Sequence, residues 1–177
     1  DLEGVDILFD PVTGEPLISP VQKPLSSFHP DDMYWDNRLS PSLPGVNHYV
    51  RAMTIYEGNL YVGGFFNVAG DVVVNGIAVW DGANWSPLEN GVDGGVLSLT
   101  VYENKLIAGG AFTSIGGVEV HNIAAWDGSR WSALGTGTGS TVYALTVYDN
   151  LLIAGGAFIY AWDGEAWTSL SPGSYPS

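Results

Sequence analysis

The sequence predicts an all-β fold, a propeller-type repeat array of about three four-stranded blades plus a half blade, with an extended N-terminal segment. One observation is a unit that recurs every 46 residues, marked by Tyr56, Tyr102 and Tyr148. A second is the composition, because 24 Gly and 10 Pro with almost no run of good helix formers favour short strands joined by turns. The third is that apolar runs of strand length alternate with turn sequences inside each unit.

Composition and charge exclude several classes of function. The chain has 177 residues, enough for one domain with a sizeable core. Its 19 acidic residues against five basic ones give a net charge of −14, which disfavours binding to nucleic acid or to an anionic membrane. No run of 18 apolar residues is present, so no membrane insertion is expected. The absence of Cys removes disulfides, thiolate metal sites and thiol nucleophiles.

Residues 1–32 do not match the repeat and are predicted to form a strand-like segment followed by a Pro-rich tether. Val5 to Phe9 resembles a short strand, and the sequence from Pro11 to Gly14 has turn chemistry. Leu17 to Ser19 could return as a second strand. The prolines that follow remove backbone donors and disfavour helix, so the chain is expected to be extended there.

Residues 33–177 are predicted to form the repeats, with a half blade at 33–49 and units at 50–95, 96–141 and 142–171. The repeat starts halfway through a unit, because the Trp35-Asp36 pair matches Trp80-Asp81. In each full unit an alternating first strand ends at the marker Tyr, and a short polar turn follows. The second strand is a nearly continuous apolar run with two adjacent glycines, which indicates burial on both faces and close approach of another backbone.

A hairpin with an Asp-Gly turn between two tryptophans is expected to join the third and fourth strands of each unit. The two Trp of each pair lie on opposite arms and can meet across the hairpin. These structural hairpins comprise Trp80, Asp81, Gly82 and Trp85; Trp126, Asp127, Gly128 and Trp131; and Trp162, Asp163, Gly164 and Trp167. The third copy lacks ten residues before Trp162, in the connection between its second and third strands, where a loop can shorten without damage to a sheet.

The repeated pattern, V-x-A-L-x-V-Y-x-x-x-L-x-x-G-G-x-F followed by N-x-I-A-x-W-D-G-x-x-W-x-x-L-G, resembles the kelch-like, galactose-oxidase-central-domain-like propeller repeats of bacterial surface proteins. The resemblance covers residues 33 to 170. It implies the propeller fold, but propellers host enzymes, lectins and scaffolds alike. The copper ligands of the oxidase have no counterpart here, so no catalytic residue is carried over.

Three and a half blades do not close a propeller, and an open array leaves exposed strand edges. The N-terminal segment could complete the half blade within its own chain, or it could be donated to a neighbouring copy by strand addition. Two chains could also pair into a larger ring, or the chain could be a fragment of a larger propeller. The assembly residues expected for strand donation are Val5, Ile7, Leu8, Phe9, Leu17 and Ile18.

The sequence gives little support for catalysis. His29, His48 and His121 share no metal-ligand spacing, and no G-x-S-x-G motif is present. The aspartates of the three hairpins recur with the repeat, which indicates a structural role rather than acid–base chemistry. Calcium remains possible, because the Gly-rich loops carry four oxygen donors: Asn47, Asp71, Asn90 and Asp93. No other cofactor is predicted.

The sequence therefore predicts a non-catalytic, extracellular or cell-surface protein that assembles with copies of itself into an oligomer or filament. The expected contacts are the N-terminal segment or the exposed blade ends. Export is expected because the chain starts at Asp1 without Met, as a processed protein or an excised segment would. The alternative is a glycan-binding module that stacks aromatic side chains on sugar rings.

Overall fold

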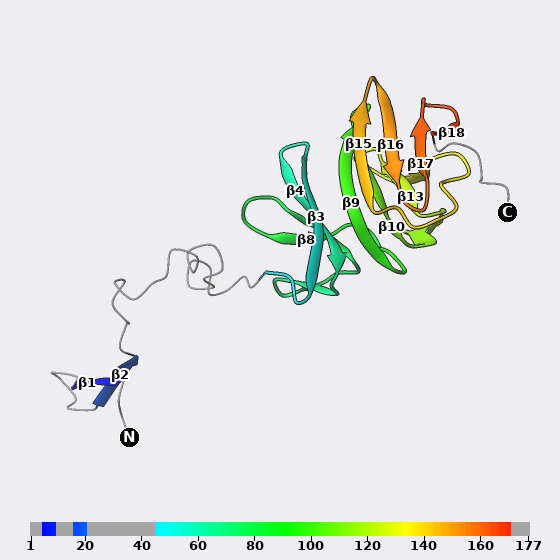
Figure 1. The fold of residues 1–177 in the computed structure, drawn as a ribbon. Coiled ribbons are helices and arrows are strands. Elements are labelled where there is room, and N and C mark those ends of the chain that lie inside the picture. Colours follow the sequence, from blue (N-terminus) through cyan, green and yellow to red (C-terminus); the bar gives the residue numbers. More distant parts are fainter. Residues whose placement is uncertain (1–4, 10–15, 21–44, 171–177) are drawn as a thin grey trace. The chain divides into compact units, whose positions relative to one another are not determined.

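The structure is a computed structural model, and it describes residues 5–9, 16–20 and 45–170. The chain divides into two compact units, residues 1–39 and residues 40–177 (Figure 1). All elements of the described residues are strands, which confirms the all-β class. Residues 33–44 of the predicted half blade and the predicted boundary between residues 32 and 33 lie outside the described residues, and they stay predictions. Of the remaining residues of the half blade, Val46 forms an isolated bridge to Ala69, and Tyr49 begins the strand Tyr49–Tyr56.

The first unit contains one antiparallel strand pair. Strand β1 (Val5–Phe9) pairs with β2 (Pro16–Pro20), and the register places Ile7 opposite Ile18 and Leu8 opposite Leu17. Both strands agree with the sequence prediction, and β2 is one residue longer at each end than expected. The Pro11–Gly14 turn lies outside the described residues.

The second unit contains three four-stranded antiparallel sheets, which are the blades (Figure 1). The chain crosses each blade from first to fourth strand without a crossover, as the repeat predicted. The first blade comprises β3 (Tyr49–Tyr56), β4 (Asn59–Phe65), β7 (Ile77–Trp80) and β8 (Trp85–Pro87). The second comprises β9 (Gly95–Tyr102), β10 (Lys105–Ala111), β13 (Ile123–Trp126) and β14 (Trp131–Ala133). The third comprises β15 (Ala144–Tyr148), β16 (Leu151–Gly155), β17 (Ile159–Trp162) and β18 (Trp167–Ser169).

Two small hairpins were not predicted. Strand β5 (Val68–Ala69) pairs with β6 (Val72–Val73), and β11 (Ser114–Ile115) pairs with β12 (Val118–Glu119). Both lie in the connection between the second and third strands of their blades. The third copy lacks this hairpin, because its ten-residue deletion falls there and β16 passes through a short turn into β17.

The turn after each first strand brings two successive residues to positive φ. In the second blade these are Glu103 at 46° and Asn104 at 56°, and in the third they are Asp149 at 50° and Asn150 at 60°. This conformation matches the twist of a tight hairpin, and Asn and Gly adopt it with little strain. It sets the register of the first two strands in every blade.

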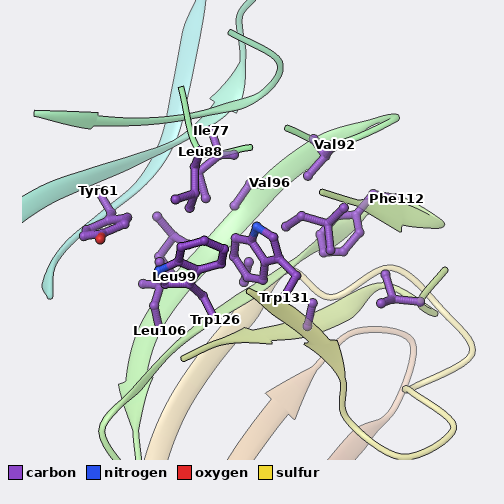
Figure 2. Close-up of a cluster of buried hydrophobic side chains, with 14 of the residues drawn as sticks. Tyr61, Ile77, Leu88, Val92, Val96, Leu99, Leu106, Phe112, Trp126 and Trp131 are labelled. Atoms are coloured by element: carbon purple, nitrogen blue, oxygen red, sulfur yellow. The ribbon is translucent and has the colours of Figure 1, made fainter. Parts of the chain in front are cut away.

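The core lies between the blades as well as within them. A large cluster of buried side chains joins the first and second blades, with Leu106 and Ile115 fully buried and Trp126 6% exposed (Figure 2). A second cluster joins the second and third blades around Ile107 and Leu152. Strand β10 of the middle blade is buried along its whole interior, as its continuous apolar run predicted. The packing between successive blades therefore forms most of the core.

Candidate interaction surfaces

The Asp of each Trp hairpin accepts hydrogen bonds from the backbone of its own turn. In the second blade Asp127 Oδ1 accepts hydrogen bonds from the Ser129 amide at 2.9 Å, the Ser129 hydroxyl at 2.7 Å and the Arg130 amide at 3.0 Å. These bonds, with that of the Ser129 hydroxyl first, lower the pKa of Asp127 to about 2. Asp81 and Asp163 accept the equivalent backbone bonds, which also lower their pKa values. These carboxylates therefore stabilise the turns of the three hairpins.

The two tryptophans of each hairpin meet across the strands. Trp126 and Trp131 are register partners with ring centroids 5.4 Å apart, and the pairs in the first and third blades are 5.3 Å and 5.2 Å apart. Trp126 and Trp131 are only 6% and 3% exposed. The second-blade pair is therefore packed away from solvent and offers no platform on which a sugar ring could stack.

Two of the four predicted calcium donors, Asp93 and Asn47, accept hydrogen bonds within the fold. Both carboxylate oxygens of Asp93 accept bonds from the 113–114 segment, with the Thr113 hydroxyl at 2.6 Å from Oδ2. Asn47 accepts the equivalent backbone bonds from Asn67 and Val68, so both residues fix the base of the small hairpins. Burial acts to raise the pKa of Asp93, but the Thr113 hydroxyl and backbone amides bring it below the ordinary value. Among residues 5–9, 16–20 and 45–170, no three His, Asp or Glu side chains lie close enough to hold a metal ion.

The other candidates do not converge on one site. The His48 ring packs edge-on against the Tyr49 ring with centroids 4.3 Å apart, His121 is exposed, and His29 lies outside the described residues. No helix in the described part of the chain could span a membrane.

Successive blades are joined by a hydrogen bond that repeats. The Tyr56 hydroxyl donates to the Asn104 carbonyl of the second blade at 3.1 Å, and Tyr102 donates to the Asn150 carbonyl of the third at 2.9 Å. Burial, followed by the charge of the adjacent glutamate, raises the pKa of both tyrosines. The marker Tyr of the repeat is therefore a joint between blades, a role that its 46-residue spacing alone did not reveal.

A glycine and a valine also meet at each junction. A Cβ atom on Gly63 would lie 2.9 Å from Val96 Cβ of the second blade, and one on Gly109 would lie 3.1 Å from Val142 Cβ of the third. Only a residue without a side chain allows this approach. In the first two blades, the first glycine of the predicted pair thus receives the valine of the next blade.

These contacts define two sides of every blade. We call the side that meets the following blade the forward face, marked by the Tyr and by a Leu after the hairpin: Tyr56 and Leu88, Tyr102 and Leu134, Tyr148 and Leu170. We call the other side the backward face, marked by a Val and an apolar residue three positions later: Val50 and Met53, Val96 and Leu99, Val142 and Leu145.

The outer two faces of the array are exposed. Tyr148 is 73% exposed and Leu170 is 53% exposed, whereas the equivalent Tyr102 and Leu134 are 6% and 9% exposed. At the opposite end Met53 is 64% exposed, although the equivalent Leu99 is only 9% exposed. The forward face of the third blade and the backward face of the first thus present apolar side chains that the same repeat buries elsewhere.

The first strands also line a cleft. It has a volume of about 480 Å³ and is lined by Arg51, Leu97 and Tyr143, which occupy equivalent positions 46 residues apart, together with Phe65. The Arg51 guanidinium lies 5.4 Å from the centre of the Tyr49 ring. A second cleft of about 400 Å³ lies among the asparagines between the first two blades, beside His48.

Residues 30–177 match the family model described as the Rax2 C-terminal beta propeller domain. The chain belongs to this family. The match confirms the β-propeller part of the sequence resemblance, but it does not support the narrower kelch-like, galactose-oxidase-like assignment to bacterial surface proteins. As a domain of the Rax2 propeller family, the chain is a structural or interaction module.

Other comparisons add little to the Rax2 assignment. No curated protein matches the chain. The computationally designed Ika4 protein, a solved structure, is 20% identical over 73% of this chain and 75% of its own, with a TM-score of 0.48. The designed Ika8 protein is 21% identical over 68% of this chain and 46% of its own, with a TM-score of 0.32. At these TM-scores neither likeness carries an argument.

Proposed function

We propose that this propeller is a non-catalytic module that associates with copies of itself through the exposed faces at the two ends of its blade array. The observation that carries the proposal is the exposure of apolar side chains at both ends. Met53 and Leu170 are more than half exposed, although the repeat buries their equivalents. Such concentrations of exposed apolar surface are typical of protein interaction sites.

The absence of catalysis is part of the same proposal. The shifted carboxyl pKa values belong to groups engaged in turns, and the shifted tyrosines belong to the packing between blades. Neither cleft brings together a nucleophile, a base and a donor for a developing negative charge. We also propose that the module lies outside the cell, and protease treatment of intact cells would test that location.

Light scattering over a range of concentrations tests self-association. The full chain and a chain that starts at Pro30 should both form particles heavier than one chain, because the proposed contacts lie in the blades. Loss of association on truncation would instead assign the contact to the N-terminal segment, through the strands that contain Leu8 and Leu17. A single-chain mass for both, up to high concentration, would end the proposal.

Glycan binding in the first-strand cleft is the second candidate. Tyr143 is 67% exposed and Phe65 is 40% exposed, so aromatic rings are available at this cleft, unlike the tryptophans of the second blade. Screening the full chain against a glycan array tests this function. Binding that disappears in Tyr143→Ala, but persists in a Tyr148→Ala control on the forward face, would support it.

A further inference from the structure

The two exposed end faces are the two halves of one junction that the chain forms twice. Blade one joins blade two through Tyr56, and blade two joins blade three through Tyr102, with the same hydrogen bond in each case. The forward face of the third blade carries the next tyrosine, Tyr148. The backward face of the first blade carries Val50, which occupies the position equivalent to Val96 and Val142.

We propose that the forward face of the third blade binds the backward face of the first blade in a second copy, in the register of the internal junctions. This inference rests on the proposed self-association and adds the partner surface and the polarity. It predicts that the Tyr148 hydroxyl donates to the Gly58 carbonyl of the second copy. It also predicts that Val50 of that copy packs over Gly155.

The acceptor is correctly placed for this bond. Gly58 lies 46 residues before Asn104, which accepts from Tyr56, and Asn104 lies 46 residues before Asn150. All three residues have positive φ, with Gly58 at 80°, so their turns share one conformation. Gly58 has no atom within 4 Å of where a Cβ would lie, which leaves room for an approaching tyrosine.

The apolar contact is also unfilled at both ends. At the internal junctions Val96 and Val142 are 0% and 1% exposed, but Val50 is 40% exposed. A Cβ on Gly155 would meet only Ala144 of its own blade, at 3.7 Å, and no valine from a following blade. Val50 and Gly155 are therefore the two partners of a valine–glycine contact that does not form within one chain.

The polarity follows from the difference between the faces. The forward face has the hydroxyl donor and the glycine recess, whereas the backward face has the carbonyl acceptor and the valine. Two identical faces would oppose donor to donor or valine to valine, so a symmetric dimer does not reproduce the junction. Head-to-tail contact instead builds a ring if the rotation closes and a filament if it does not.

Engineered cysteines in the full chain test the register, because the natural sequence contains no Cys. One variant carries Gly155→Cys and another carries Val50→Cys. The equivalent built Cβ separations at the internal junctions are 2.9 Å and 3.1 Å, shorter than the Cβ separation of about 3.8 Å in a disulfide, so the two blades must move apart by about 1 Å to form the bond. Val50→Cys also removes the Cγ atoms, which are the nearest atoms to the added Cβ at the internal junctions. The matched control replaces Val50→Cys with Val73→Cys, a position 75% exposed but on a small hairpin.

Oxidation of the equimolar mixture of Gly155→Cys and Val50→Cys should give a disulfide-linked dimer that neither variant forms alone. Linkage of Gly155→Cys to itself would indicate a symmetric pair and overturn the proposal. Equal linkage to Val73→Cys would indicate random collision and would also overturn it. If light scattering shows assembly but the mixture does not link, the register is wrong while self-association stands. Single-chain mass without linkage means that both have failed.

Tyr148→Phe provides a second measurement that does not require a new covalent bond. Loss of one hydrogen bond should raise the dissociation constant of the assembly about fivefold. Tyr143→Phe is the control, since Tyr143 is similarly exposed but lines the first-strand cleft. Equal effects of the two variants, or no effect of Tyr148→Phe on an assembly that forms, would contradict the predicted bond.

Discussion

The hydroxyl of Tyr102 donates a 2.9 Å hydrogen bond to the carbonyl of Asn150, and this bond joins the end of one blade's first strand to the first turn of the next. Tyr102→Phe removes the donor and leaves a partly buried carbonyl without it. We expect a loss of about 1 kcal/mol in the free energy of unfolding, measured by urea denaturation in dilute solution. Tyr148→Phe should change it by less than about 0.5 kcal/mol, since Tyr148 is 73% exposed. Equal losses would show that this bond does not stabilise the junction.

Gly109→Ala should destabilise the chain, because the added Cβ would lie 2.6 Å from Val142 Cγ1. Overpacking of this kind costs about 1–3 kcal/mol. The matched change Gly155→Ala should be tolerated in dilute solution, where its nearest neighbour is Ala144 Cβ at 3.7 Å. Thermal unfolding of both variants compares them directly, and a lower midpoint for Gly155→Ala than for Gly109→Ala would contradict the packing described here.

Asp127 should make stability depend on pH in the acid range. Hydrogen bonds from the turn, with that of the Ser129 hydroxyl first, lower its folded-state pKa to about 2, below the unfolded value of about 3.9. The contribution is therefore fully present above the unfolded pKa and is lost as pH falls from about 4 to about 2. NMR titration of the Asp127 carboxyl should give a midpoint near 2. Asp127→Asn should flatten the pH dependence of stability in that window, and an unchanged profile would count against the assignment.

Tyr56 and Tyr102 should make stability depend on pH in the alkaline range. Burial first, and then the neighbouring glutamate, raises the pKa of each phenol above its ordinary value of about 10. The contribution is fully present below the unfolded pKa and is lost as pH rises through the raised folded pKa. The free energy of unfolding of the double variant, with Phe at both positions, should fall less steeply above pH 10 than that of the natural chain. The absorbance of tyrosinate reports the ionisation of the phenols, and circular dichroism over the same pH range reports unfolding.

Ile115→Ala tests the unpredicted hairpin of the second blade. Ile115 is fully buried in the cluster between the first two blades, so the cavity should cost about 2–5 kcal/mol. Val73→Ala in the corresponding hairpin of the first blade is the control, because Val73 is 75% exposed and should cost little. A small loss for Ile115→Ala in urea denaturation would mean that the hairpin lies on the surface rather than in the core.

The strands and the Trp hairpins could be predicted because their signals are local. Alternation along 97–102 and the Asp-Gly turn at Asp127 depend only on neighbouring residues. The β11–β12 hairpin could not be predicted, since two-residue strands are too short to show a period. The role of Tyr102 could not be predicted either, because it depends on how one blade lies against the next. The regular 46-residue spacing of this tyrosine was visible in the sequence, but spacing alone does not identify the residue that the tyrosine contacts.

Sequence patterns also cannot tell where an identical side chain will be buried. Tyr102 and Tyr148 end equivalent strands, yet one is 6% and the other 73% exposed. Tyr102 packs against the third blade, whereas no blade of the described residues packs against Tyr148, so the difference depends on the neighbouring blade rather than on the residue. For the same reason, the sequence motivated assembly in general terms, and only the structure distinguished the two end faces from the internal ones.

The middle blade is packed on both sides, and among residues 45–170 each outer blade packs against one other blade. In a chain of such nearest-neighbour contacts, opening begins at the ends and moves inward. Amide hydrogens of β10 should therefore exchange most slowly and those of β16 much faster, although the two strands have nearly the same sequence. A partner bound at the third blade would slow exchange in β16 toward that of β10, so the exchange rate itself would report whether the array has been extended.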